Sequence, residues 1–204
     1  MYIEMLEQGM ARDPEHEQAY FRILQSEGAR LTRLITNVLE LAKLEKKHRR
    51  PNLQKGGFAE VLADVESLMQ AALRQAGFRL EIENALTEPF EYDREIMVQV
   101  LINLIENSMK FGRSSPAKTI TLRLREAGDR VRIEVADTGP GIPAGDLKKI
   151  FDDFYRAGDA VSSEAGGTGI GLALVRRFVG LLGGRVSAAN NPGAGCTIRI
   201  ELPR

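Results

Sequence analysis

The spacing of hydrophobic residues divides the chain into an N-terminal part with a helical repeat and a longer part in which helical and strand patterns both occur. Asp13-Pro14-Glu15 is typical of a helix start, and the cations of 46–50 before Pro51 are typical of a helix end. Between them, apolar residues recur at spacings of three and four, as on one face of a helix. This stripe comprises Leu24, Leu31, Leu34, Ile35, Val38, Leu41, Ala42 and Leu44. The pattern predicts one long helix, which a shorter helix over residues 2–11 would complete as a hairpin.

After this first unit, residues 1–50, a second unit covers residues 51–204. Helical patterns cover 58–75, 93–111 and 169–182. Alternation typical of half-buried strands covers 78–82, 120–124, 131–135, 185–189 and 196–202, with a further short strand at 52–54. The glycine-rich segment 138–166 predicts a mobile lid. Helices separated from mostly antiparallel strands predict an α+β fold, a two-layer α/β sandwich with the helices on one face of a mixed sheet.

Composition excludes several classes of protein. The 28 basic and 28 acidic residues leave no excess charge that would favour nucleic acid. The single cysteine, Cys196, cannot form an internal disulfide and suits a reducing compartment. No apolar run reaches the roughly 18 residues of a membrane span, and no signal peptide is recognisable. We therefore expect a cytoplasmic location for these residues, within a parent protein that a membrane segment elsewhere could anchor.

Three motifs carry candidate chemistry. Asn103, Asn107 and Lys110 are spaced four and three apart, so they share one helix face. Asp137 ends a strand and precedes Gly139-Pro140-Gly141; its carboxylate can accept a hydrogen bond from the amino group of adenine. The third motif, Gly166-Gly167-Thr168-Gly169-Ile170-Gly171, opens an apolar helix whose first N–H groups are available to an anion.

In this order, the motifs resemble the asparagine box and two glycine boxes of the catalytic, ATP-binding core of bacterial sensor histidine kinases. The segment 151–156, Phe-Asp-Asp-Phe-Tyr-Arg, is similar to the phenylalanine box of that family, and residues 1–50 resemble the end of its dimerisation and phosphotransfer hairpin. The resemblance implies a histidine kinase, gyrase and Hsp90-type ATPase fold. It also implies transfer of the γ-phosphate of Mg-ATP to a histidine, for relay to a response regulator receiver domain. Finally, it favours a homodimeric bundle over packing of the apolar stripe within one monomer.

The resemblance also assigns residues to the nucleotide. It implies that Asn107 ligates magnesium, that Asn103 is its companion, and that Asp137 binds adenine. Lys110 would meet phosphate oxygens as a point charge. The remaining residues placed around ATP or ADP are Phe111, Gly139, Gly141, Ile142, Phe154, Arg156, Gly167, Thr168, Gly169, Ile170, Gly171 and Leu172.

Asn103, Glu106 and Lys110 are the candidate catalytic residues. Asn103 cannot take up a proton at neutral pH, which favours phosphoryl transfer over rapid ATP hydrolysis. Glu106 orients the nucleophile or metal-bound water, or it is a solvated helix charge; the sequence leaves both open. Phe151 and Phe154 either anchor the lid by packing or are simply core aromatic residues.

The phosphoacceptor motif of the family is missing. The chain has two histidines, His16 and His48, and neither lies in a matching sequence. Either the chain begins after the acceptor histidine, which we favour, or the protein lacks one; in both cases we expect no autophosphorylation of this chain alone. A second interpretation is a non-catalytic nucleotide-binding or interaction module that uses the lid as a switch. The hairpin remnant at 30–39 favours a histidine kinase over a serine-kinase anti-sigma factor.

Overall fold

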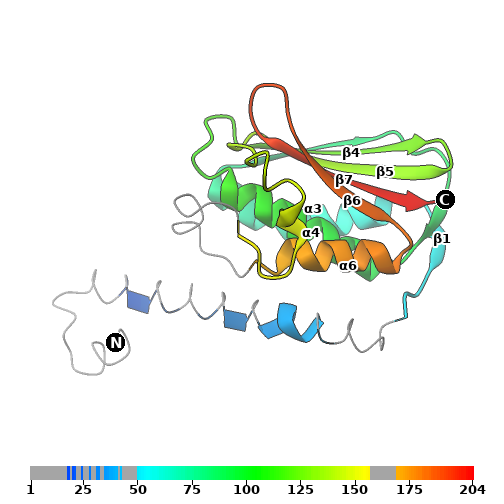
Figure 1. Ribbon diagram of the computed structural model, residues 1–204, viewed down its shortest axis with the longest axis horizontal. Coiled ribbons are helices and arrows are strands. Elements are labelled where there is room, and N and C mark those ends of the chain that lie inside the picture. Colours follow the sequence, from blue (N-terminus) through cyan, green and yellow to red (C-terminus); the bar gives the residue numbers. More distant parts are fainter. Residues whose placement is uncertain are drawn as a thin grey trace.

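The computed structural model describes residues 50–156 and 169–204 continuously, together with scattered positions between 18 and 42 (Figure 1). Every position described between 18 and 42 is helical, in agreement with the predicted long helix. Apolar residues of this stretch, among them Leu31 and Ile35, are exposed. The predicted first helix, His16 and His48 lie outside the described residues. None of the helices in the described parts of the chain combines the length and apolar character needed to cross a bilayer.

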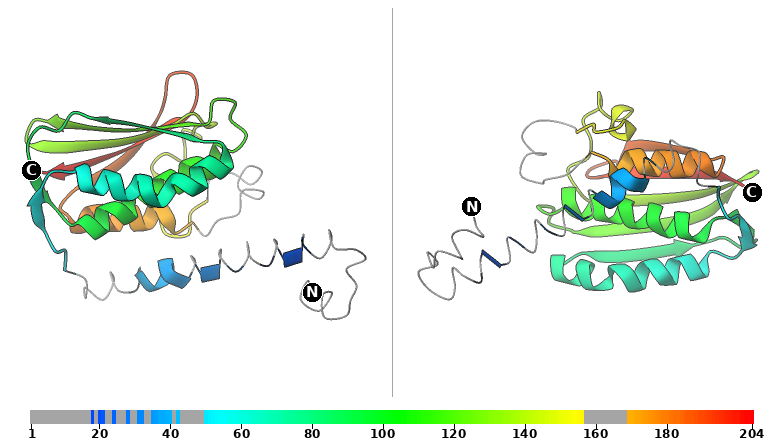
Figure 2. Two further views of the ribbon diagram at one scale, coloured as in Figure 1. Left: turned by 180° about the vertical axis from the view of Figure 1, so that it is seen from behind. Right: turned by 90° about the horizontal axis from the view of Figure 1, so that it is seen from below.

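The second unit has eleven described elements. In chain order they are β1 (Gln54–Gly56), α3 (Ala59–Ala76), β2 (Arg79–Asn84), β3 (Phe90–Tyr92), α4 (Arg94–Phe111), β4 (Thr119–Ala127), β5 (Arg130–Asp137), η1 (Lys149–Phe151), α6 (Gly171–Leu181), β6 (Arg185–Asn190) and β7 (Cys196–Pro203). The main sheet has the order β2-β4-β5-β7-β6, parallel only between β2 and β4. Helices α3, α4 and α6 all lie on one face of it (Figures 1 and 2). The predicted two-layer α+β sandwich is therefore confirmed.

The core lies between these two layers. Inward-facing residues of the central strands, such as Leu122 and Ile133, meet fully buried residues of α4 and α6, such as Leu101 and Phe178. Helix α4 begins at Asp93, whose Oδ1 accepts a hydrogen bond from the Ile96 N–H at 3.0 Å. The other carboxylate oxygen accepts one from the Asn52 N–H at 2.8 Å. This one side chain therefore caps the helix and also holds the start of the second unit.

A small second sheet differs from the sequence prediction. The strand expected at 52–54 is β1 at Gln54–Gly56, and it pairs with β3, which the pattern did not predict. Three residues are too few to show alternation, so only packing reveals β3. Its Phe90 and Tyr92 rings lie 5.6 and 5.1 Å from the ring of Phe58, between centroids.

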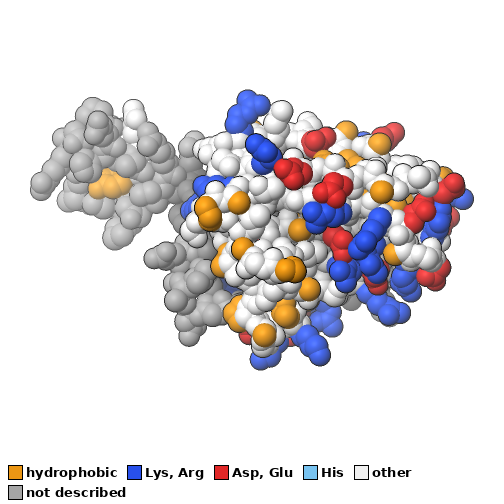
Figure 3. Space-filling model, turned by 90° about the horizontal axis from the view of Figure 1, so that it is seen from above, with side chains coloured by type: hydrophobic (Ala, Val, Ile, Leu, Met, Phe, Trp, Pro, Cys, Tyr) orange, Lys and Arg blue, Asp and Glu red, His pale blue; other side chains and the backbone are white. Residues whose placement is uncertain are grey.

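The outer face of the main sheet carries paired charges. Glu134 is buried between Arg125 and Arg199, with oxygen–nitrogen distances of 3.4 and 2.7 Å. Arg132 pairs with Glu201 at 2.7 Å. Figure 3, which views the molecule from the sheet side, shows acidic and basic side chains interspersed over much of this face. This face therefore presents no field of one sign, in agreement with the balanced composition.

Candidate active site

The asparagine motif of α4 meets the start of α6. A Cβ added at Gly171, the first residue of α6, would lie 3.3 Å from Asn103 Oδ1 and 3.6 Å from Asn107 Nδ2. The Asn103 amide is oriented by donating a hydrogen bond from Nδ2 to the Gln99 carbonyl oxygen at 2.9 Å. Glycine at position 171 therefore keeps open the space between two amide side chains and the beginning of a helix.

This beginning of α6 has the electrostatics of an anion site. Its N-cap residue, Ile170, offers no side-chain hydrogen bond to the first turn. The N–H groups of the first turn have no partner within the helix, and the aligned peptide dipoles make this end positive. The Ile170 side chain itself is buried in the core, whereas Gly171 and Leu172 are half-buried. A phosphate group near Gly171 would thus meet backbone donors, with amide side chains beside it.

Three further candidate residues, Glu106, Lys110 and Phe111, lie in the last turns of α4. Lys110 Nζ lies 4.4 Å from the centroid of the Phe111 ring, a cation–π contact. Phe111 itself is 37% exposed. Glu106 is half-buried and engaged in an interaction, so the structure leaves both of its expected roles open.

Asp137 lies at the end of β5 and is held by several donors. Its Oδ1 accepts hydrogen bonds from the backbone N–H groups of Gly139, at 2.9 Å, and Cys196, at 3.2 Å. Its Oδ2 accepts hydrogen bonds from Ser108 Oγ, at 3.4 Å, and Cys196 Sγ, at 3.2 Å. Donors from α4, from the turn after β5 and from β7 together fix the position of this carboxylate.

Cys196 is buried against Asp137. Burial is the main cause that raises the pKa of the Cys196 thiol well above its ordinary value, and the negative charge of Asp137 and the hydrogen bond to it raise the pKa further. The thiol therefore remains protonated at neutral pH. In that form it is a donor to Asp137.

Two glycines allow the backbone to pack closely around Asp137. A Cβ at Gly139 would lie 3.0 Å from Asp137 Oδ1. At Gly195, which has a φ of +84°, a Cβ would overlap the Asp137 carbonyl oxygen. Sequence reasoning included Gly139 but missed Gly195, together with Ser108 and Cys196. In the sequence, residues 190–195 are recognisable only as a turn. They lie close to Asp137 because β5 pairs with β7, and that pairing cannot be read from the sequence pattern.

The predicted lid segment begins at the Gly139-Pro140-Gly141 turn after β5 and contains a short helix, η1. Phe151, in η1, is buried, which confirms that it can anchor the segment by packing. The same expectation is wrong for Phe154, which is 63% exposed and has a φ of +61°. Tyr155 packs against the core instead and donates a hydrogen bond from its hydroxyl to Asp146 at 2.7 Å.

The described residues on either side of 157–168 lie close together. A Cβ at Gly169 would lie 2.7 Å from the Phe154 carbonyl carbon. Arg156 is exposed and makes an interaction of its own. Gly167 and Thr168, two predicted ligands of the nucleotide, lie outside the described residues. The structure thus brings the described residues before and after 157–168 together beside the start of α6.

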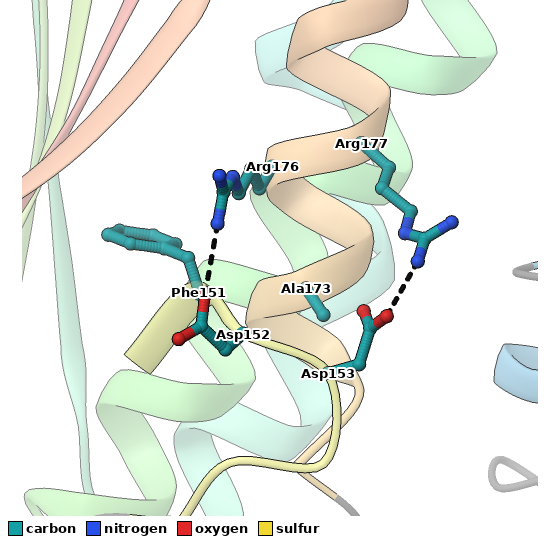
Figure 4. Close-up of a pocket in the computed structure, with 6 residues that line it drawn as sticks. All are labelled: Phe151, Asp152, Asp153, Ala173, Arg176 and Arg177. Atoms are coloured by element: carbon teal, nitrogen blue, oxygen red, sulfur yellow. Dashed lines mark hydrogen bonds and ion pairs between the residues drawn. The ribbon is translucent and has the colours of Figure 1, made fainter. Parts of the chain in front are cut away.

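Ion pairs join the two residues that follow η1 to α6, beside a hollow of about 470 Å³ (Figure 4). Arg176 contacts Asp152 at 3.1 Å and Arg177 contacts Asp153 at 2.6 Å. The lining of the hollow does not include Asn103, Asn107 or Asp137, so we do not assign the nucleotide to it.

Comparison with known proteins identifies the class of this fold and site. Residues 92–204 match the family described as histidine kinase-, DNA gyrase B- and HSP90-like ATPases. The match includes α4, both described glycine motifs and the end of the chain. The chain belongs to this family.

Similarity to individual proteins extends further along the chain. It is 31% identical to the sensor protein kinase WalK of Staphylococcus aureus over 202 residues, which are 99% of this chain and 48% of the kinase. For the same kinase from strain Newman the identity is again 31%, with 33% of the kinase covered. The chain thus spans half or less of the length of these relatives.

Solved structures show the same arrangement. The histidine kinase AdeS of Acinetobacter baumannii superposes with a TM-score of 0.78 over 99% of this chain and 91% of that one, and its 23% identity supports the fold alone. Full-length ShkA in complex with AMPPNP has a TM-score of 0.75 and 28% identity, over 96% of this chain and 42% of ShkA. The histidine kinase ThkA in complex with the response regulator TrrA has a TM-score of 0.75 and 25% identity, over 98% and 55%.

Proposed function

We propose that this chain is the ATP-binding catalytic part of a two-component sensor histidine kinase. The observation that carries the proposal is that Asn103 and Asn107 face Gly171 at the positive end of α6, while Asp137 lies held at the end of β5. A nucleotide with its adenine amino group at Asp137 and its phosphates at the start of α6 would use both of these features. Similarity to ShkA, whose structure was solved in complex with AMPPNP, supports nucleotide binding by this chain.

The donor set also fits magnesium. Among the described residues, no group of three or more His, Cys, Asp or Glu side chains could hold a metal ion. Magnesium is usually held by few protein oxygens, with phosphate and water oxygens completing its shell. Asn107 would supply the protein oxygen. When bound, magnesium would neutralise charge on the phosphates.

In the reaction, a histidine nitrogen forms a bond to the γ-phosphorus, the bond from that phosphorus to the β–γ bridging oxygen breaks, and ADP leaves. Catalysis of such a transfer is mostly positioning and charge stabilisation. Asn103 orients the nucleotide, Lys110 stabilises phosphate oxygens, and Glu106 orients the incoming histidine. Phe111, Gly139, Gly141, Ile142 and Leu172 line the site.

The parent protein would supply the rest of the pathway. Residues 1–50 would be the end of a dimerisation hairpin, residues 51–204 the catalytic domain, and the acceptor histidine would lie outside this chain. The exposed apolar residues near Leu31 and Ile35 support a homodimeric bundle. The ThkA–TrrA complex supports a response regulator receiver domain as the partner. The domain would act in the cytoplasm.

Two experiments test the proposal. Calorimetry with ADP and GDP, each with magnesium and with a chelator, should show metal-dependent binding and a preference for adenine. Labelled ATP should then phosphorylate a histidine when this chain is extended upstream through the parent gene, but not when the chain is used alone. Adenine binding without transfer in the extended protein would favour a non-catalytic nucleotide module. Equal binding of GDP would refute the site.

A further inference from the structure

The end of β6 and the turn that follows it reach across to the first residues of the lid segment. Asn190 Oδ1 accepts a hydrogen bond from the Ile142 N–H at 2.8 Å, and Asn190 Nδ2 donates one to the Ile142 carbonyl oxygen at 2.7 Å. The side-chain amide thus pairs with both backbone groups of one residue, as a neighbouring strand does in a ladder. Within residues 50–156 and 169–204, the hydrogen bonds of the Ile142 backbone both go to Asn190.

The next residue of the same turn holds the other end of this segment. Asn191 Nδ2 donates to the Asp137 carbonyl oxygen at 3.0 Å, and Asn191 Oδ1 accepts from Thr197 Oγ1 at 2.6 Å. Consecutive asparagines therefore fix the backbone at 137 and at 142. Between these two points the chain carries the adenine-binding candidate Asp137 and the glycines of the first glycine motif.

Close packing shows that this contact is shaped by the local sequence. Gly141 has a φ of +81°, and a Cβ there would lie 3.0 Å from Asn190 Oδ1 and 3.4 Å from the Gly195 carbonyl oxygen. A side chain at 141 would therefore push the turn away from the lid. The glycine makes room for the amide of Asn190, as well as permitting a left-handed backbone.

We propose that Asn190 is a positioning residue for the nucleotide, an inference that rests on the proposed function. Its amide fixes the point where the lid leaves the sheet and thereby holds Ile142 at the adenine end of the site. Residues beyond 142 can then rearrange around the phosphates while the adenine end keeps its shape. Asn190 itself acts through the backbone of Ile142 and needs no contact with the ligand.

The test measures ADP affinity and hydrogen exchange in the wild type, Asn190→Ala and a matched control, Asn84→Ala. The Asn84 side chain also bonds to backbone, because its Oδ1 accepts a hydrogen bond from the Leu86 N–H at 3.1 Å, but it lies at the far edge of the sheet. Loss of two partly solvated hydrogen bonds should weaken ADP binding by about three- to tenfold in Asn190→Ala. Exchange should accelerate at 140–143 and not at 130–136, and Asn84→Ala should match the wild type.

Asn190→Asp gives a readout that a purely structural role would not move. Its ionised carboxylate lacks the donor and repels the Ile142 carbonyl oxygen, whereas the protonated acid has both a donor and an acceptor. The ratio of its ADP dissociation constant to that of the wild type should therefore fall as the pH is lowered from about 7.5 to about 4.5, towards the range in which aspartate protonates. The corresponding ratio for Asn190→Ala should stay constant over this range.

The outcomes are distinguishable. Wild-type affinity in Asn190→Ala, or a pH-independent ratio for Asn190→Asp, would overturn the role of Asn190 while leaving the site intact. A wild-type chain that does not bind ADP would overturn the proposed function and this inference with it. The same loss of affinity in Asn84→Ala would show a general effect on stability, and would also contradict the inference.

Discussion

The two ends of the candidate site are built differently. At the adenine end, Asp137 receives hydrogen bonds from two backbone N–H groups and two side chains. At the phosphate end, α6 begins with a glycine, its N-cap residue supplies no side-chain cap, and partly exposed ion pairs join Asp152 and Asp153 to α6. Under the proposed function, this difference predicts that the adenine end is preorganised, whereas the phosphate end completes its contacts only when the ligand binds.

The largest effect is expected at the preorganised end. Asp137→Asn replaces one acceptor oxygen with a donor that faces the adenine amino group and internal donors such as Ser108 Oγ. A mismatched buried polar group commonly costs about one to three kcal/mol. Because both the adenine amino group and the internal donors would lose an acceptor, we expect ADP affinity to fall about 100-fold. Calorimetry measures this. The preference for ADP over GDP should disappear as well, and a retained preference would show that Asp137 does not read the base.

The second prediction concerns Asn107. Asn107→Ala removes the expected protein ligand of magnesium, so magnesium-dependent ADP affinity should fall about tenfold, the size of one hydrogen bond or contact to a charged group. The matched variant Asn107→Asp keeps an oxygen and should retain metal dependence. In the presence of a chelator, the wild type and Asn107→Ala should bind equally. An alanine variant that keeps its full metal dependence would exclude Asn107 as the ligand.

Hydrogen exchange tests the phosphate end directly. A non-hydrolysable ATP analogue adds a γ-phosphate to the contacts made by ADP, so it should slow exchange across 140–156 more than ADP does. The strand 130–137 should respond equally to both ligands because the adenine end is already ordered. Equal protection of the lid at saturation with each ligand would show that the γ-phosphate does not drive closure.

Features with a short sequence period could be predicted from the sequence, whereas contacts between distant segments could not. Helices α3, α4 and α6 and the β4–β5 hairpin were predictable because their apolar residues repeat with a clear period. The grouping of Asn103, Asn107 and Lys110 followed from helix spacing alone. Phe154 was misjudged because an aromatic residue in a loop carries no periodic signal of burial. Asn190 was missed because its partner, Ile142, lies 48 residues away in the sequence. Only the folding of the sheet brings the two residues together.

Alkaline pH should reveal the buried thiol at the adenine end. Between its ordinary pKa of 9.0 and its raised folded pKa, the Cys196 thiol keeps its proton when folded and loses it when unfolded. The unfolded state then binds fewer protons, so the free energy of unfolding falls as pH rises above 9, by up to about 1.4 kcal/mol per pH unit from this group. Denaturant unfolding at several pH values should show a shallower fall in Cys196→Ser, whose hydroxyl does not ionise there. Parallel curves for the two proteins would contradict the assignment.

The smallest effect is expected from the ion pairs at the lid base. The Arg177 and Asp153 side chains are 32% and 39% exposed, so solvent screens their 2.6 Å contact. An exposed pair contributes about 0.2–1 kcal/mol, and a double-mutant cycle with Asp153→Asn and Arg177→Gln should give a coupling energy in that range for unfolding. High salt should remove it. Because η1 anchors the lid, exchange at 149–156 should rise in each single variant, whereas 130–137 should not change. A coupling energy that is unaffected by salt would mean that packing of the aliphatic parts of the side chains, rather than charge, couples Asp153 to Arg177.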